Sequence, residues 1–167
     1  MEIEREIEQL HAASFGWAMS CCGRNHQDAE EILQDVYVKI LEGKARFDGR
    51  SSLKTWLFAV IRRTAAAQAR RRMLHDLLTA KWARRELDPI SEPADSAAQH
   101  SEISAALIEA LRKLAQRQRE VLELVFYHDM TIEQAAAAMH VSLGSARVHY
   151  DRGKKQLLAK LNGKLTP

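Results

Sequence analysis

The stretch from Asp129 to Lys155 reads DMTIEQAAAAMHVSLGSARVHYDRGKK and decides the fold of the C-terminal part of the chain. Thr131 and Gln134 have the spacing of a capping box, in which each side chain accepts a hydrogen bond from the other residue's backbone N–H. Apolar residues then recur at helical spacing on one face. They are Ile132, Ala135, Ala136 and Met139. The stretch therefore predicts a short helix that begins beside Thr131.

A second helix is predicted after a break in this pattern at residues 140–141. Ser142 is suited to cap it, and Ala146, Tyr150 and Leu157 mark its inward face. Two short helices with a tight turn and small residues at their crossing form a helix-turn-helix. The outward residues mix cations with apolar and polar tips, which suits a helix lying in a DNA major groove. These residues are Arg147, Val148, Asp151, Arg152 and Lys155.

Charge is unevenly distributed, although the 25 Lys and Arg and 22 Asp and Glu leave a net charge of only +3. Residues 1–43 carry −6, residues 44–72 carry +8, residues 73–111 carry −4 and residues 112–167 carry +5. Two basic blocks separated by an acidic one predict two places where the chain meets phosphate. A basic helix face can also be merely solvated, so the helix-turn-helix by itself leaves DNA binding open.

The composition predicts a mostly helical protein. The 167 residues are 46% hydrophobic and 28% charged, which is ordinary for a globular chain and enough for one domain or two small ones. Long stretches lack Gly and Pro and are rich in Ala, Leu, Glu and Arg, which favour helix. No alternating run rich in β-branched residues predicts a sheet.

Membrane insertion, secretion and metal binding are not expected. No apolar stretch approaches the roughly 20 residues that span a bilayer, and the N-terminus MEIEREIE is acidic, unlike a secretory signal. We therefore expect a cytoplasmic protein. The adjacent Cys21 and Cys22 are interpreted as reduced, small apolar residues. The seven His residues show no metal-ligand spacing, so neither a metal site nor a cofactor is predicted.

Three helices are predicted in the N-terminal half. The first covers residues 4–22 and ends at Gly23. The second starts with the acids of residues 28–31, which favour a helix N-terminus. A loop over residues 47–52 contains a glycine and two serines that favour turn geometry, and a third helix covers residues 53–72.

Trp56 and Phe58 follow this loop and precede a row of arginines. Aromatic rings beside cations and hydroxyls can hold the unstacked bases and the backbone of a single nucleic-acid strand. Two other interpretations stay open: Trp56 can be a core residue, and the arginine run can be a solvated helix end. The arginines are Arg62, Arg63, Arg70, Arg71 and Arg72.

Residues 76–102 lose the helical periodicity and contain two prolines and several acids, which predicts a linker with at most a short helix near its start. Helical stripes resume near Glu102 and again from Arg117 to Phe126, and these helices would brace the helix-turn-helix. The predicted architecture is all-α, with two small helical domains, 1–75 and 103–163, joined by a flexible linker.

Three stretches carry a family resemblance. DAEEILQDVY at residues 28–37, residues 47–72 with SLKTWL at 52–57, and residues 111–157 with REVL and GSARV occur in a fixed order. In this order they resemble the extracytoplasmic-function sigma factors, compact two-domain members of the bacterial primary sigma family. The first stretch resembles the helix that binds the polymerase clamp helices. The second resembles the region that recognises and melts the minus-ten element, and the third resembles the domain that reads the minus-thirty-five element.

The resemblance implies three sets of site residues. Those that would bind core polymerase are Asp28, Glu31, Gln34, Asp35, Tyr37 and Val38. Those at the minus-ten element would be Arg50, Ser51, Ser52, Lys54, Trp56, Arg62, Arg63, Arg70, Arg71 and Arg72. Those at the minus-thirty-five element would be Ser145, Arg147, Val148, His149, Asp151, Arg152, Lys154 and Lys155.

Some positions depart from the family pattern. Arg63 and Ala67 stand where members commonly carry Asn and Asp, so the minus-ten preference does not follow from the resemblance. Val148 and His149 replace a frequent Ser-Arg pair. His140 stands at a turn position that is often Gly, and it must tolerate a left-handed or strained backbone.

The resemblance implies a promoter-specificity subunit, not an enzyme, that serves a stress- or signal-responsive regulon. The loop at residues 49–52 would hold a base flipped out of the stack. The implied partners are promoter DNA, the beta-prime clamp helices and beta flap of core RNA polymerase, and an anti-sigma factor that binds across both domains. No catalytic residues are expected.

Two other classes of function stay open on the residues alone. A conventional helix-turn-helix repressor or activator would bind a palindromic duplex without polymerase. A nucleic-acid enzyme would need paired carboxylates in a basic groove, a metal-ligand cluster or a phosphate loop, and the sequence shows no such pattern. Association with core polymerase would separate the three classes.

Overall fold

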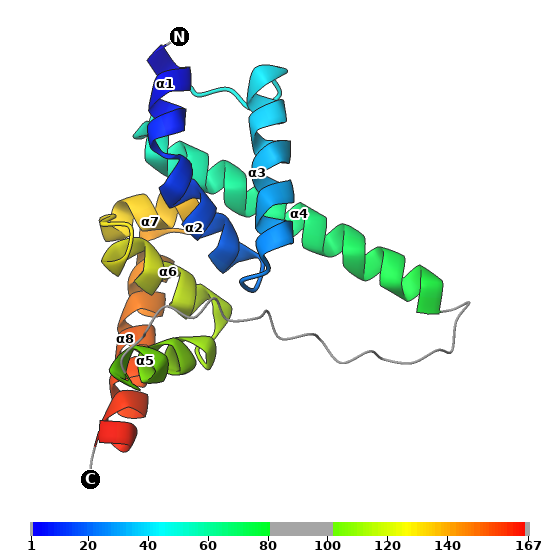
Figure 1. Cartoon of the computed structure of the whole chain (residues 1–167). Helices are drawn as coiled ribbons and strands as arrows, with labels where there is room; N and C mark the ends of the chain where they lie inside the picture. Colours follow the sequence, from blue (N-terminus) through cyan, green and yellow to red (C-terminus); the bar gives the residue numbers. More distant parts are fainter. Residues whose placement is uncertain (1, 81–101, 166–167) are drawn as a thin grey trace. The chain divides into compact units, whose positions relative to one another are not determined.

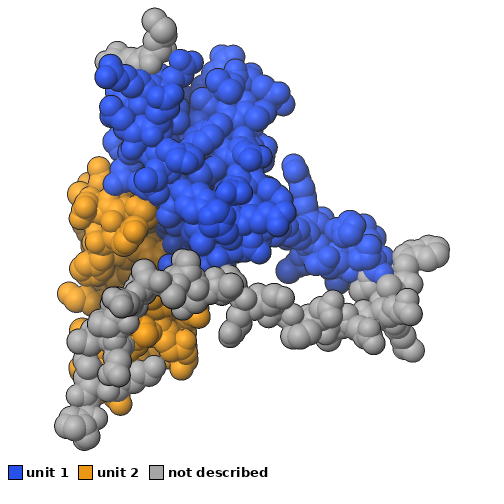
Figure 2. Space-filling view, in the orientation of Figure 1, with its two compact units in different colours: residues 1–94 blue, residues 95–167 orange. Residues whose placement is uncertain are grey.

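The computed structural model describes residues 2–80 and 102–165, and every secondary-structure element in those ranges is an α-helix (Figure 1). The chain divides into two compact units, residues 1–94 and 95–167, which Figure 2 shows in separate colours. The prediction of an all-α chain with two helical domains is confirmed. The N-terminal unit contains α1 (Glu2–Gln9), α2 (His11–Cys21), α3 (His26–Leu41) and α4 (Leu53–Ala80). The C-terminal unit contains α5 (Glu102–Arg112), α6 (Gln116–Phe126), α7 (Ile132–Met139) and α8 (Leu143–Leu165).

An apolar core holds α2, α3 and α4 together in the N-terminal unit. The Trp17 indole is fully buried, stacks on the Phe58 ring with 5.8 Å between centroids, and donates from Nε1 to the Phe58 carbonyl oxygen at 3.0 Å. Ile32, Val36 and Leu57 are also almost completely buried. The prediction that Phe58 helps to hold an unstacked base is therefore wrong, because this core encloses its ring.

The predicted single helix over residues 4–22 is divided at Leu10 into α1 and α2. The Leu10 N–H is shared between the carbonyl oxygens of Glu6 and Ile7, each at 3.1 Å, which tightens the turn at this residue. The helix end at Gly23 is confirmed. Gly23 has a φ of +67°, the left-handed conformation that commonly ends a helix.

The other two helices of this unit begin with side-chain caps. Asn25 Oδ1 accepts from the Asp28 N–H at 3.1 Å, so α3 starts two residues before the predicted Asp28. Ser52 Oγ accepts from the Thr55 N–H at 3.1 Å at the start of α4. The helix continues to Ala80, past the predicted end at Arg72, so residues 76–80 of the predicted linker are helical. Residues 81–101 of that linker lie outside the described residues.

In the C-terminal unit α8 packs against α5, α6 and α7. Val121, Leu122, Leu124 and Met139 are almost completely buried in the core between them. Gly153 marks the closest approach of α8 to α6, because a Cβ atom there would lie 3.1–3.2 Å from atoms of Gln118 and Leu122. The predicted bracing of the helix-turn-helix by the two preceding helices is confirmed.

The predicted helix-turn-helix is formed by α7 and α8. Both bonds of the capping box are present: Gln134 N–H to Thr131 Oγ1 at 3.1 Å, and Thr131 N–H to Gln134 Oε1 at 2.9 Å. His140 ends α7 with a φ of 53° in the left-handed region, as its position requires. Among the described helices, none is both long enough and apolar enough to cross a membrane.

Candidate nucleic-acid interface

The outward face of α8 is fixed by the turn before it and by the residues that α8 buries. Ser142 Oγ accepts from the Ser145 N–H at 3.1 Å and lies 2.9 Å from the Ser145 hydroxyl, which caps the helix as predicted. Ala146 is fully buried, and Tyr150 is half-buried against Phe126 with 6.0 Å between ring centroids. These contacts set the rotation of α8 about its axis, so the opposite face is turned to solvent.

Most residues predicted to read the minus-thirty-five element are exposed on this face. Val148 is 45% exposed among charged neighbours, so an apolar tip stands where it can meet a base edge. His149 alone in the set is half-buried, and Lys154 Nζ lies 5.9 Å from the centre of the Tyr150 ring. The exposed residues are Ser145, Arg147, Val148, Asp151, Arg152, Lys154 and Lys155.

Most polar groups of the loop before α4, residues 48–52, bond to other groups of the loop or to the first turn of α4. Gly49 turns the chain with a φ of +74°. Asp48 accepts from the Arg50 backbone N–H at 3.2 Å and pairs with the Arg50 Nε at 3.3 Å. Ser51 Oγ donates to the Ser52 carbonyl oxygen at 3.2 Å, and Ser52 Oγ is occupied in capping α4. The serine hydroxyls predicted to hold a flipped base thus have local partners.

The aromatic residue that α4 presents near this loop is Trp56. Its side chain is half-buried and packs on Phe47 with 5.5 Å between ring centroids. It is therefore neither a fully enclosed core residue nor a free surface ring. Lys54, also half-buried, places its Nζ 5.8 Å from the centre of the Phe58 ring.

A hollow of about 390 Å³ lies beside Trp56, and the sequence analysis did not identify it. Its floor comes from one face of α4, since Trp56, Val60, Arg63 and Ala67 recur at spacings of four, three and four residues. That spacing was the signal that could have found it. The remaining lining residues come from α4, the end of α3 and the segment after it: Lys39, Lys44, Ala45, Arg46 and Thr64.

The hollow is basic, but two of its cations are paired. Lys39 Nζ bonds Asp35 Oδ2 at 2.8 Å and Thr64 Oγ1 at 3.2 Å. Lys44 Nζ lies 2.6 Å from Glu42 Oε2, and this hydrogen bond raises the pKa of Lys44. Both lysines thus have an acidic partner close to the ammonium group and carry little uncompensated charge.

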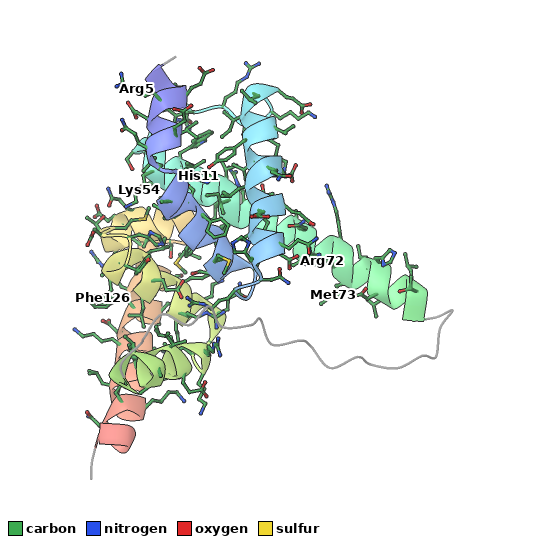
Figure 3. The ribbon with its side chains drawn as sticks, in the orientation of Figure 1. Arg5, His11, Lys54, Arg72, Met73 and Phe126 are labelled. Atoms are coloured by element: carbon green, nitrogen blue, oxygen red, sulfur yellow. The ribbon has the colours of Figure 1, made fainter. Side chains whose placement is uncertain are left out.

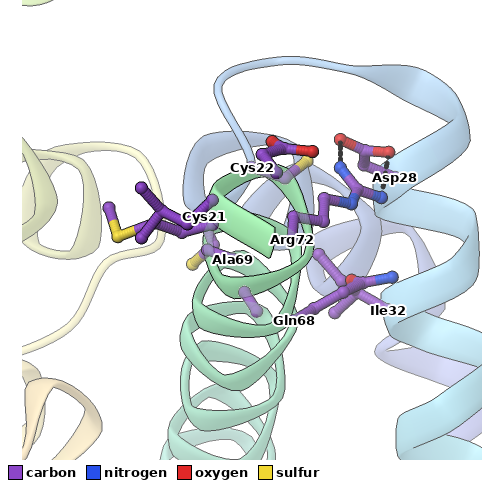
Figure 4. Close-up of a pocket in the computed structure, with 11 residues that line it drawn as sticks. Cys21, Cys22, Asp28, Ile32, Gln68, Ala69 and Arg72 are labelled. Carbon is purple, nitrogen blue, oxygen red and sulfur yellow. Dashed lines mark hydrogen bonds and ion pairs between the residues drawn. The ribbon is translucent and has the colours of Figure 1, made fainter. Parts of the chain in front are cut away.

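The arginines predicted for the minus-ten strand do not form one group. Arg63, Arg70 and Arg71 are exposed and Arg62 is half-buried. The Arg72 guanidinium instead forms a two-pronged ion pair with Asp28, and this hydrogen bond raises the pKa of Arg72 (Figure 4). A predicted DNA contact and a predicted polymerase contact are therefore bonded to each other.

The residues predicted to bind polymerase lie along α3. Glu31, Gln34, Asp35 and Val38 are exposed. Tyr37 is half-buried; its hydroxyl lies 2.9 Å from His11 Nδ1, and burial raises its pKa. Asp28 is also half-buried, with 16% of its side chain exposed.

A second hollow, of about 640 Å³, lies between α2, α3 and α4 and was also missed by the sequence analysis. Figure 4 shows Cys21, Cys22 and Ala69 around it, with the Asp28–Arg72 pair at its side. The predicted unbridged state of both cysteines is confirmed. Burial, followed by the charge of Asp28, raises the pKa of Cys22 and keeps it a thiol.

The part of α4 that follows Arg72 extends beyond α3 (Figure 3). It carries four large apolar side chains that are each at least 60% exposed. They are Met73, Leu74, Leu77 and Leu78.

Comparisons with known proteins agree with the two units. Residues 7–74 match the model of Sigma-70 region 2, and residues 104–157 match that of Sigma-70, region 4. The ECF RNA polymerase sigma factor SigX of Bacillus subtilis is 30% identical over 138 residues, which cover 80% of this chain and 71% of that protein. The RNA polymerase sigma factor CarQ of Myxococcus xanthus is 28% identical over 136 residues, which cover 80% of this chain and 75% of that protein.

Solved structures share the fold. The sigma factor RpoE of Bartonella quintana, crystallised with the anti-sigma factor NepR, superposes with a TM-score of 0.72 at 25% identity, covering 96% of this chain and 97% of that one. CnrH, solved with the cytosolic domain of CnrY, superposes with a TM-score of 0.61 at 20% identity, covering 96% of this chain and 88% of that one. The family resemblance of the sequence is confirmed, and the chain belongs to the extracytoplasmic-function sigma factors of bacterial RNA polymerase.

Proposed function

We propose that the chain joins core RNA polymerase in the cytoplasm, reads two elements of a promoter and opens the downstream one, with no catalytic step of its own. The observation that carries this proposal is the outward face of α8, where Arg147, Val148 and Arg152 stand exposed on a helix oriented by a capped turn. A helix of this kind enters the DNA major groove with its N-terminal residues toward base edges.

At the upstream element, Arg147 and Arg152 contact bases or phosphates, and Val148 and Asp151 adjust the choice of sequence. Arginine can bond guanine through two donors, whereas a valine methyl suits the thymine methyl group. Ser145, His149, Lys154 and Lys155 stand on or beside this face. Their contacts go to the DNA backbone, which fixes the position of the helix.

At the downstream element, α4 and the loop before it hold the strand that is separated from its partner. Unstacking a base costs a few kcal/mol, which contacts in a pocket and cations along the strand can offset. Trp56 supplies an aromatic surface that is half open to solvent. The cations are Arg50, Lys54, Arg62, Arg63, Arg70 and Arg71, with Ser51 and Ser52 shaping the loop, and Arg72 joins them only when its pair with Asp28 opens.

The exposed side of α3 binds the beta-prime clamp helices, and the C-terminal unit binds the beta flap. The acids and polar residues on α3 favour a basic partner surface. Asp35 and Glu31 are the exposed acids of this set, and Val38 adds an apolar contact that is 48% exposed.

An anti-sigma factor is the proposed inhibitor. RpoE of Bartonella quintana, which shares the fold over 97% of its own length, was crystallised with one. A protein that covers the α3 face and the α8 face would block polymerase and promoter together.

Transcription in vitro tests the proposed function. The full chain is mixed with bacterial core RNA polymerase and a plasmid library in which both promoter elements are randomised, and the transcripts are sequenced. We expect enrichment of two separated sequence blocks that core polymerase alone does not enrich. Failure of the chain to associate with core polymerase, together with tight binding of intact duplex by the chain alone, would instead indicate a conventional helix-turn-helix repressor or activator.

A further inference from the structure

The hollow beside Trp56 has the parts of a binding site for a single base. Trp56, Val60 and Ala67 give it an aromatic and aliphatic floor, with Arg63 on the same face of α4. Side chains on an α-helix lean toward its N-terminus, so Arg63 leans toward Trp56, two turns earlier. A flat ring that stacks on Trp56 would therefore present its edge to the guanidinium.

Arg63 is the cation of this hollow that stands on the same face of α4 as Trp56. Lys39 and Lys44 are paired with Asp35 and Glu42. Arg46 donates from Nε to the Gly43 carbonyl oxygen at 3.0 Å. Arg63 is exposed and makes no hydrogen bond or ion pair within residues 2–80 and 102–165.

The polar side chains of the hollow can donate hydrogen bonds but offer almost nothing that accepts them. Lys and Arg side chains and the Trp indole have donors only. The Thr64 hydroxyl is buried and already accepts from Lys39. A base that fits such a lining presents adjacent acceptors, and guanine does so with O6 and N7. Unpaired cytosine also has adjacent acceptors, O2 and N3, but its single ring covers less of Trp56 than the two fused rings of guanine, so stacking favours guanine. Adenine places an amino donor beside N7, so its amino group would face the guanidinium without an acceptor.

We propose that this hollow binds one unstacked guanine of the separated promoter strand, with the base on Trp56 and Arg63 bonded to O6 and N7. The inference rests on the proposed function and specifies the base that the downstream site selects. It also moves the flipped base from the serine loop at residues 49–52 to the face of α4. The partly neutralised lysines and the apolar floor favour a base over a phosphate as occupant.

The test exploits the different bonding of Arg and Gln. Gln carries a donor and an acceptor and pairs with adenine N6 and N7, so Arg63→Gln should change the preferred base from guanine to adenine. The randomised promoter library described above is transcribed by holoenzyme containing the wild-type chain, Arg63→Gln or Arg5→Gln. Arg5 is an exposed arginine on α1 of the same unit, lies outside the proposed contact sets and does not line the hollow. Because Arg63 is exposed, its substitution should not disturb folding.

With the wild-type chain we expect one downstream position to favour guanine by about 5- to 150-fold, the range for one bidentate base contact. Arg63→Gln should favour adenine at that position and leave the upstream block unchanged, while Arg5→Gln should keep guanine. A wild-type preference for another base, or the same preference in Arg63→Gln, would overturn this inference and leave the proposed function standing. Absence of any enriched block with the wild-type chain would overturn the proposed function itself.

Discussion

Arg72 on α4 and Asp28 in the first turn of α3 form a two-pronged ion pair across 44 residues of sequence. Arg72 Nη2 lies 2.6 Å from Asp28 Oδ1 and 3.5 Å from Glu31 Oε2, and Gln68 Nε2 donates to Glu31 at 3.1 Å. The cluster joins the α3 face proposed to bind polymerase to the α4 face proposed to bind DNA. A substitution in this cluster therefore affects both surfaces.

We expect Asp28→Asn and Arg72→Gln each to lower the unfolding free energy of the N-terminal unit by about 1 kcal/mol. Arg72 is 48% exposed, so solvent screens the pair and keeps its contribution small. The double variant should lose little more than either single one, because both remove the same interaction. Urea unfolding followed by tryptophan fluorescence measures these values, since all three tryptophans lie within residues 1–94 and Trp17 is buried in the core of the N-terminal unit. Additive losses in the double variant would show that the two residues act independently.

Gly153→Ala should destabilise the C-terminal unit by about 1–2 kcal/mol. An added Cβ would lie 3.1 Å from Gln118 Cβ and 3.2 Å from the Gln118 carbonyl oxygen, and a backbone atom cannot move aside without shifting α6. Gly163→Ala on the same helix is the matched control: its Cβ meets nothing within 4 Å, so helix propensity should leave stability unchanged or slightly higher. Hydrogen exchange of the α6 and α8 amides checks both variants, and equal protection in the two would refute the close contact.

Cys22 should react with iodoacetamide more slowly than an ordinary thiol. Burial and Asp28 raise its pKa above its ordinary value near 9.0, so less thiolate is present at a given pH. Because the folded-state pKa is raised, the thiol stabilises the fold below pH 9, and this contribution is lost as pH rises toward the folded-state pKa. Alkylation of a Cys21→Ser variant across pH 7–10 should show a higher midpoint when folded than in urea. Equal alkylation midpoints in the folded chain and in urea would show that the fold does not raise the pKa of Cys22.

The C-terminal unit was the more predictable from sequence, because its signals are local. The capping box of Thr131 and Gln134, the break at His140 and the cap at Ser142 each involve residues within a few positions of one another. The outward face of α8 follows from Ala146 and the helical period alone. Predicted contact residues such as Arg147 and Arg152 are exposed as expected.

The N-terminal unit was less predictable, because its decisive contacts join distant residues. Nothing near Phe58 in sequence indicates that Trp17 stacks on it 41 residues earlier. The pairing of Arg72 with Asp28 is equally non-local. The sequence therefore could not show which arginine of the run forms an ion pair with α3. The hollow beside Trp56 needs the end of α3 as a wall, and only its α4 floor is visible in the spacing.

Asp35→Arg should weaken association with core polymerase by at least tenfold and lower transcription in proportion. The change reverses the charge at the centre of the proposed polymerase face and removes the partner of Lys39 Nζ at 2.8 Å. Glu30→Arg makes the same charge change on the same helix at an exposed position outside the proposed set, so it should retain core affinity. Fluorescence titration of labelled chain with core polymerase measures both. An unchanged affinity of the Asp35→Arg variant for core polymerase would show that Asp35 is not part of the interface.

Arg147→Ala should lower transcription from an enriched promoter by about 5- to 150-fold while core affinity stays at the wild-type value. The side chain lies exposed near the start of α8, where a bidentate base contact contributes about 1–3 kcal/mol of discrimination. Arg112→Ala is the matched control, since it removes an exposed arginine from α5 in the same unit and should retain transcription. The measurement pairs transcript yield with core affinity for each variant. A fall in core affinity for Arg147→Ala would place the residue at a polymerase contact. Equal transcript loss in both variants would show that Arg147 contributes only positive charge and makes no specific contact with a base.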